Sequence, residues 1–239
     1  MKTDRNRNQL SLELLVVFSS VALCSIVLIA VFPPTTEKRI YIEKLLIGTI
    51  FAAICVGGEI ASLFPRKCVS TSKAHAYPAN SGIRNEQDLA VRGHHFDCGR
   101  FSTHTIQSGG RVYCAACTGL FAGTLAALAV SVIYFFFGMS VSVFSIPMIV
   151  FGEFSIVTGL FEYRLKHWLR TFANFLFVVG GSLIIIGADA YIHSLFIDLF
   201  VIGSILLWII TRIAISRWEH TRICVSCGFS CTKKVEMVV

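Results

Sequence analysis

Six long runs of apolar residues alternate with shorter polar segments along the chain. They cover residues 14–32, 45–64, 118–137, 141–161, 171–188 and 195–211. A helix needs about 20 consecutive apolar residues to cross the hydrocarbon core of a bilayer, and each run is close to that length. Only three charged side chains fall inside the runs, namely Glu59, Glu153 and Asp198. The pattern therefore predicts an all-α integral membrane protein with six transmembrane helices.

The composition agrees with a membrane protein and excludes a soluble globular domain. Charged residues make up 15% of the chain and hydrophobic residues 55%, whereas soluble domains carry about 25% charged residues. The net charge of +7 is accounted for by basic residues near anionic lipid headgroups. Since the sequence contains no RNA- or DNA-binding motif, we expect the lipid bilayer as a partner and no nucleic acid.

The distribution of basic residues predicts the orientation of the helices. With the N-terminus in the cytosol, the inner segments hold 18 of the 21 lysines and arginines, as the positive-inside rule requires. The first apolar run is longer than the core of a typical signal peptide, and no small-residue cleavage site precedes Pro33. It is therefore expected to remain as a signal-anchor helix. We predict a multi-pass protein of the cell membrane with both termini in the cytoplasm.

The polar segments divide the chain into five parts. Residues 1–64 hold the first two helices, 65–92 a cytosolic linker, 93–117 a cytosolic loop, 118–217 the last four helices and 218–239 a cytosolic tail. Within the loop, the pair Gly109-Gly110 is expected to turn a short hairpin before the third helix. Very short links at 138–140 and 189–194 predict two antiparallel helical hairpins.

Two groups of cysteines carry the most specific chemical signal, and the predicted topology puts both on the cytosolic side. The first group belongs to the loop and the second to the tail. Their members are Cys98, Cys114 and Cys117, then Cys224, Cys227 and Cys231. In a reducing compartment such cysteines remain thiols, and thiols at this spacing favour zinc. The loop and the tail are therefore predicted to be metal-binding.

Zinc takes four thiolate or imidazole ligands in structural sites, so the loop needs a histidine beside its three cysteines. His95 is the first choice and His104 the second. The tail has His220 as its nearest fourth donor. Three arrangements remain open for the tail: a second zinc site, one site shared by both CxxC pairs, or no metal. A dithiol–disulfide couple at Cys114 and Cys117 is a further alternative, because a helix N-terminus stabilises a thiolate.

Two other features lie within the apolar runs. Glu59 and Glu153 could form a polar cavity or a proton site, since an ionisable residue inside a membrane is costly, or they could serve helix–helix hydrogen bonding. Gly119 and Gly123 form a GxxxG pair, which favours close helix packing within the chain and leaves a homodimer as the alternative.

The stretch from Cys98 to Cys114-Ala-Ala-Cys117-Thr-Gly resembles the signature of a family of small prokaryotic predicted membrane proteins of unknown function. That signature is a Cys followed later by Cys-Ala-Arg-Cys-Thr-Gly leading into a helix. The similarity covers about residues 94–190. It includes a Pro, two Gly, an acidic residue and an Arg, which are Pro147, Gly152, Gly159, Glu162 and Arg170. The chain departs from the family at Gly99, Ala116 and Phe151. The resemblance implies membrane location and supplies no activity.

Three classes of function fit these observations. The first is a membrane protein with a cytosolic zinc site of structural or regulatory role, acting on a membrane-protein partner or as a homodimer. The second is a membrane enzyme that uses a Cys/His metal or dithiol site at the cytosolic interface. The third is a small transporter or metal-handling protein that uses Glu59 and Glu153.

Overall fold

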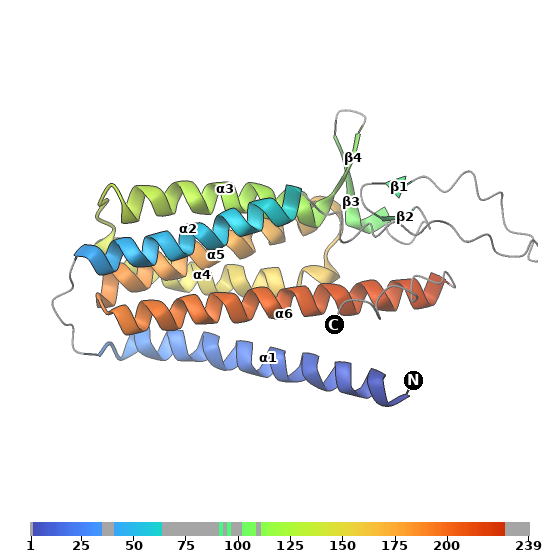
Figure 1. The fold of residues 1–239 in the computed structure, drawn as a ribbon, viewed down its shortest axis with the longest axis horizontal. Helices are drawn as coiled ribbons and strands as arrows, with labels where there is room; N and C mark the ends of the chain where they lie inside the picture. The colour runs from blue at the N-terminus through green and yellow to red at the C-terminus, as the bar shows by residue number, and fades with distance from the viewer. Residues whose placement is uncertain are drawn as a thin grey trace, which may run out of the picture.

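A computed structural model describes the backbone of residues 2–34, 41–63, 91–92, 95–96, 102–108 and 111–227. Side chains are described for residues 9–34, 41–63, 103–108 and 112–223. Six helices are long and apolar enough to cross a membrane, which confirms the predicted number. Figure 1 shows them as α1 (Lys2–Val31), α2 (Tyr41–Leu63), α3 (Ala115–Phe135), α4 (Ser145–Leu160), α5 (His167–Ile192) and α6 (Leu195–Cys227).

Short strands precede α3. Strands β1 (Val91–Arg92) and β2 (His95–Phe96) pair antiparallel, as do β3 (Thr105–Ser108) and β4 (Arg111–Cys114). In the second pair Ser108 lies opposite Arg111, so residues 109–110 are the whole connection. The predicted hairpin at Gly109-Gly110 is therefore confirmed. Single 3₁₀ turns complete the described structure: η3 (Ser102–His104), η4 (Ser142–Phe144) and η5 (Glu162–Arg164).

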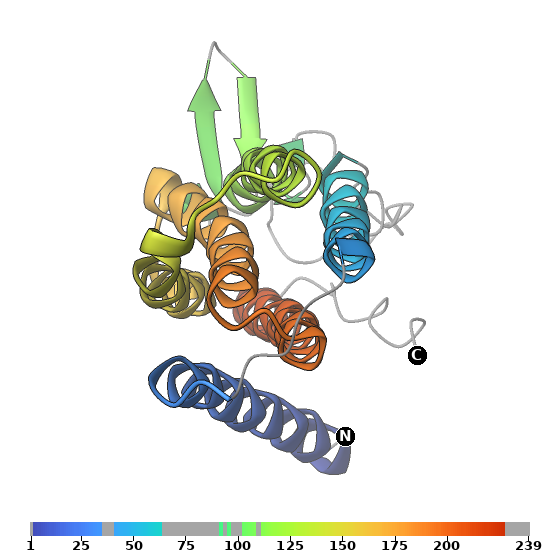
Figure 2. The same cartoon turned by 90° about the vertical axis from the view of Figure 1, so that its left-hand side faces the viewer.

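Helix α5 lies at the centre of the bundle. It packs against α3, α4 and α6, while α2 packs on α3 and α1 packs mainly on α6 (Figure 2). The core is built from large apolar side chains of these helices, including Trp208, Phe177, Ile184 and Ile156. Helix α5 has no charge between Arg170 and Asp189, and most of its spanning segment is buried among its neighbours.

Glycines allow α5 to approach its neighbours closely. A methyl group at Gly119 of α3 would lie 2.1 Å from the Thr171 carbonyl oxygen of α5. On the other side, a methyl at Gly152 of α4 would lie 2.8 Å from the Gly180 carbonyl oxygen of α5. A Cβ atom cannot occupy either place while the helices stay where they are. Gly119 and Gly123 of the GxxxG pair both face α5, so this pair packs within the chain.

The bundle has two distinct ends. The start of α1, the β3–β4 hairpin, the α4–α5 link and the last turns of α6 gather at one end, here named the hairpin end (Figure 1). The α3–α4 and α5–α6 connections lie at the opposite end, where α1 also ends and α2 begins. The start of α1 and the end of α6 therefore share an end, as an even number of spans requires.

Helix α6 is longer than the sequence predicts. It continues to Cys227, whereas the apolar run ends at residue 211. The predicted division at residue 218 between membrane helices and a cytosolic tail stays a prediction, and the structure adds that one helix runs through this position. The physical reason is that Arg212 and Glu219 lie seven residues apart, two helical turns, and both bond into the bundle.

Candidate functional site

Cys114 and Cys117 lie where the hairpin passes into α3. Cys114 is the last residue of β4, opposite Thr105 of β3, and its backbone is extended, with φ −74° and ψ 122°. Cys117 follows in the first turn of the helix. The Thr118 hydroxyl donates to the Cys114 carbonyl oxygen at 2.9 Å. Cys114 is buried and Cys117 half-buried. The motif is thus held by a strand on one side and a helix on the other.

The other predicted zinc ligands are only partly described. His95, Cys224 and Cys227 have a described backbone only, while Cys98 and Cys231 lie outside the described residues. Within the described part of the chain, no group of three His, Cys, Asp or Glu side chains could hold a metal ion. The zinc site therefore stays a prediction, as does the choice among its ligands.

His104 contacts side chains of two transmembrane helices. It ends η3, one residue before β3, and it is buried. Its Nε2 atom lies 3.1 Å from Nη1 of Arg170 and 3.6 Å from Oε1 of Glu219. The imidazole is thus directed towards α5 and α6, where it joins a buried cluster of charges.

Glu162 is the centre of that cluster. This residue begins η5 in the α4–α5 link, and its side chain is fully buried. The Arg170 Nη2 atom donates to Glu162 Oε1 at 2.9 Å, and Arg212 of α6 forms an ion pair with the same oxygen. Asn174 donates from Nδ2 to the second oxygen of Glu162. One carboxylate therefore receives hydrogen bonds from three buried side chains.

Glu219 and Asn174 close the cluster. Arg170 donates from Nη2 to Glu219 Oε2 at 2.6 Å and from Nη1 to Oε1 at 3.3 Å. Asn174 accepts from Nη2 of Arg212 at 2.6 Å and donates to the Arg170 carbonyl oxygen at 2.7 Å. We refer to Glu162, Arg170, Asn174, Arg212, Glu219 and His104 as the ionic cluster.

The ionic cluster carries two carboxylates and two guanidiniums, so its formal charge is zero when His104 is neutral. Burying each ion costs several kcal/mol, which attraction and hydrogen bonding offset only when the geometry is good. Among the described residues, Nε of Arg170 and Nε of Arg212 have no hydrogen-bond partner. The cluster joins the segment before the hairpin, the α4–α5 link, α5 and α6 to one another.

Sequence reasoning missed most of this cluster. Glu162 and Arg170 entered only as matches to a family pattern, and His104 only as a zinc donor. Helical spacing relates only those members that belong to one helix. Asn174 follows Arg170 by four residues and Glu219 follows Arg212 by seven, so each pair shares a face of its helix.

Glu59 and Glu153 do not form a joint site. They belong to α2 and α4, which lie on different sides of the bundle with α3 and α5 between them (Figure 2). In each carboxylate one buried oxygen has no hydrogen-bond partner among the described residues. The structure therefore does not bring these two residues together, and a shared cavity has no geometric support.

A second polar contact lies at the opposite end of the bundle. The Tyr134 hydroxyl donates to Asp189 Oδ2 at 2.5 Å, and the Lys44 Nζ atom lies 3.9 Å from the centre of the Tyr134 ring. Tyr134, Asp189 and Asp198 are all buried. This contact links α2, α3 and α5.

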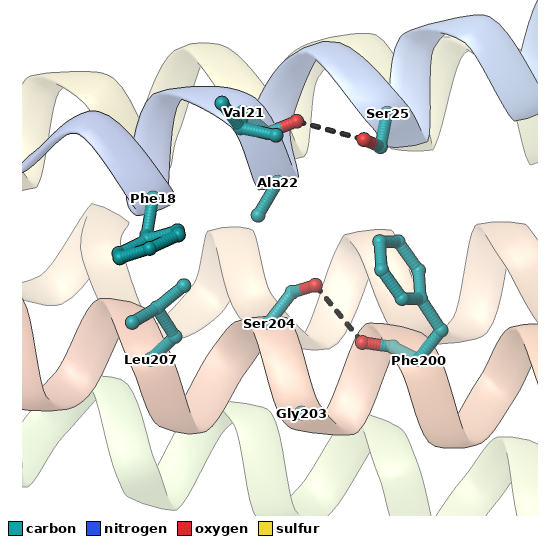
Figure 3. Close-up of a pocket in the computed structure, with 8 residues that line it drawn as sticks. All are labelled: Phe18, Val21, Ala22, Ser25, Phe200, Gly203, Ser204 and Leu207. Atoms are coloured by element: carbon teal, nitrogen blue, oxygen red, sulfur yellow. Dashed lines mark hydrogen bonds between the residues drawn. The ribbon is translucent and has the colours of Figure 1, made fainter. Parts of the chain in front are cut away.

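A groove of about 350 Å³ separates α1 from α6 (Figure 3). Its lining is mostly apolar, with Phe18 and Val21 facing Phe200 and Leu207. The only lining hydroxyls are bonded to their own helices, since Ser25 donates to the Val21 carbonyl oxygen at 2.8 Å and Ser204 to that of Phe200 at 2.9 Å. The groove thus offers no group for catalysis.

The hairpin end therefore combines a strand-to-helix CxxC motif with a neutral, buried ionic cluster. In comparisons with family models, curated proteins and solved structures, nothing matches this chain.

Proposed function

We propose that this chain is a multi-pass membrane protein whose cytosolic face is organised by zinc, with a structural or regulatory role towards its own helices or a membrane-protein partner. The observation that carries the proposal is the position of Cys114 and Cys117 at the junction of β4 and α3. A strand and a helix hold two sulfurs at the end of the bundle where the positive-inside rule places the cytosol.

The favoured ligands are Cys98, Cys114, Cys117 and His95. His104 is the weaker fourth ligand, because its Nε2 atom already faces Arg170. His95 is favoured because it precedes Cys98 by three residues in the sequence.

A regulatory role is supported by the short path from the cysteines to the transmembrane helices. Cys114 pairs with Thr105, and the residue before Thr105 is His104. His104 in turn contacts Arg170 of α5 and Glu219 of α6. A change in metal occupancy at Cys114 would therefore act on two helices through a single histidine.

The end of α6 permits the same chemistry. Cys224 and Cys227 lie three residues apart on one continuous helix, so their Cα atoms occupy neighbouring positions on one face. Both CxxC pairs belong to the hairpin end (Figure 1). Two separate zinc ions, one shared ion, and a single zinc in the loop with no metal at the end of α6 are the three forms of the proposal.

The orientation can be tested with tags at the two termini. Both tags should resist protease in right-side-out membrane vesicles and be cleaved once the vesicles are opened, because 18 of the 21 basic residues belong to that side. Cleavage of either tag in sealed vesicles would contradict the orientation.

The zinc site can be tested on the full chain purified without chelator. We expect at least one zinc per chain by metal analysis, and loss of one zinc in the double variant Cys114→Ser/Cys117→Ser. Structural zinc contributes about 10–16 kcal/mol of apparent binding free energy in small peptides, so chelation should also loosen the segment before α3. Protease cleavage between β2 and α3 would report this loosening.

Two controls make the result specific. Cys24→Ser changes an exposed cysteine of α1 and should leave the zinc content unchanged. Cys224→Ser/Cys227→Ser should remove a second zinc if the sites are separate, or the same zinc if the site is shared. A wild-type protein that purifies without zinc and binds none when zinc is added would refute the proposal.

A further inference from the structure

A row of aromatic rings flanked by arginines runs along the surface of the hairpin end. It joins the α4–α5 link to α6. The ring centres of Phe161 and Tyr163 are 6.2 Å apart, and those of Tyr163 and Trp218 are 6.5 Å apart with the rings nearly perpendicular. The Arg164 Cζ atom lies 5.9 Å and 5.7 Å from the first two rings, and the Arg222 Cζ atom lies 5.5 Å from Trp218. We call these five residues the Arg–aromatic row.

The row is exposed and keeps its positive charge. Phe161 is 51% and Trp218 40% exposed, and both arginines are exposed. Within the described part of the chain, neither Arg164 nor Arg222 forms an ion pair. The two nearest acidic residues in sequence, Glu162 and Glu219, both turn inward to Arg170. The ionic cluster thus removes the carboxylates that would otherwise neutralise this surface.

The row follows the ends of two apolar runs, so we expect it where these helices leave the hydrocarbon core. Helix α4 ends at Leu160, immediately before Phe161. In α6 the apolar run ends at residue 211, and Trp218 follows about 10 Å further along the helix axis. Aromatic side chains are enriched at this depth, because one part of the ring system is apolar while the other meets water.

We infer that the Arg–aromatic row binds the headgroup of an anionic phospholipid. A guanidinium matches the geometry of phosphate oxygens and can keep its contact with a ring while it binds them. Two exposed positive charges without carboxylate partners favour a headgroup with net negative charge over a zwitterionic one. The exposed rings beside them suit the glycerol and upper acyl region, which a soluble phosphate lacks. The inference is independent of the zinc proposal.

The test compares two double variants that remove the same charge from the same end of the full chain. Arg164→Gln/Arg222→Gln changes the row, whereas Lys166→Gln/Arg217→Gln changes two exposed basic residues that contact none of its rings. Each protein is purified in a neutral detergent and titrated with phosphatidylglycerol or phosphatidylcholine, and lipid retention is measured by native mass spectrometry. Apparent melting temperatures confirm that both variants are folded.

We expect the wild type to retain phosphatidylglycerol in preference to phosphatidylcholine. The row variant should bind phosphatidylglycerol about tenfold more weakly, since each arginine near a membrane surface contributes appreciably to attraction of anionic lipid. The matched variant should change by less than about threefold, and Arg164→Lys/Arg222→Lys should fall between the two. Equal losses in both double variants, or no preference for phosphatidylglycerol in the wild type, would overturn the inference.

Discussion

Replacing Glu162 by glutamine is expected to destabilise the protein more than any other single change in the ionic cluster. The substitution keeps the shape of the side chain and removes the charge that lies between Arg170 and Arg212. Both guanidiniums are buried, so one positive charge stays uncompensated in the bundle. Breaking a buried ion pair in this way costs about 3–5 kcal/mol. Titration with SDS from mild-detergent micelles would measure the loss in the free energy of unfolding.

Glu219→Gln is the matched comparison. Of the two arginines, only Arg170 forms an ion pair with Glu219. The Glu219 side chain is 12% exposed, so water can partly replace its contacts. We expect the free energy of unfolding to fall by about 1–2 kcal/mol, which lies between the values typical of surface ion pairs and of buried ones. If both variants lost the same amount, or Glu162→Gln were neutral, Glu162 would not be the centre of the cluster.

Gly119→Ala is expected to separate α3 from α5. The new methyl group would lie 2.1 Å from the Thr171 carbonyl oxygen and 2.9 Å from Cβ of Asn174. Neither atom belongs to a flexible side-chain end, so the helices themselves must move apart. Overpacking typically lowers the free energy of unfolding by about 1–3 kcal/mol and occasionally more. Because the new methyl group meets the backbone at this short distance, we expect a loss at or above the upper end of that range. Because Gly119 follows Cys117 by two residues, the zinc affinity of the Gly119→Ala protein should fall as well.

Gly57→Ala provides the control for that variant. Gly57 lies inside α2, and a methyl group there would meet nothing within 4 Å. Alanine in a helix is favoured over glycine by about 1 kcal/mol, so stability should stay the same or rise slightly in the same SDS titration. A Gly119→Ala protein as stable as Gly57→Ala would show that α3 and α5 are not held as closely as described.

The six spans could be predicted from sequence because a bilayer imposes a simple requirement on length and polarity. The hairpin could also be predicted, since the pair Gly109-Gly110 is a strong local turn signal. In both cases neighbouring residues determine the structure. The close contacts of Gly119 and Gly123 within the chain followed from the same kind of local pattern.

The ionic cluster could not be predicted in the same way, because its members lie far apart in sequence. His104 and Glu219 approach each other across more than a hundred residues. Each of them alone has an ordinary interpretation as a metal ligand or a surface charge. The length of α6 depends on the same contacts, since its polar turns beyond residue 211 are held by Arg212 and Glu219. Hydropathy therefore placed the helix end too early.

The positions of the cluster residues along the chain pair each negative charge with a positive one during synthesis. A ribosome completes α4 and α5 before α6, so Glu162 and Arg170 reach the membrane together as one negative and one positive group. Helix α6 then brings Arg212 and Glu219, again one of each sign. The charges of the cluster residues therefore sum to zero after α5 is made and again after α6 is made. The nascent chain can build a buried charge cluster without first holding an unmatched ion at the membrane, where such an ion would be costly.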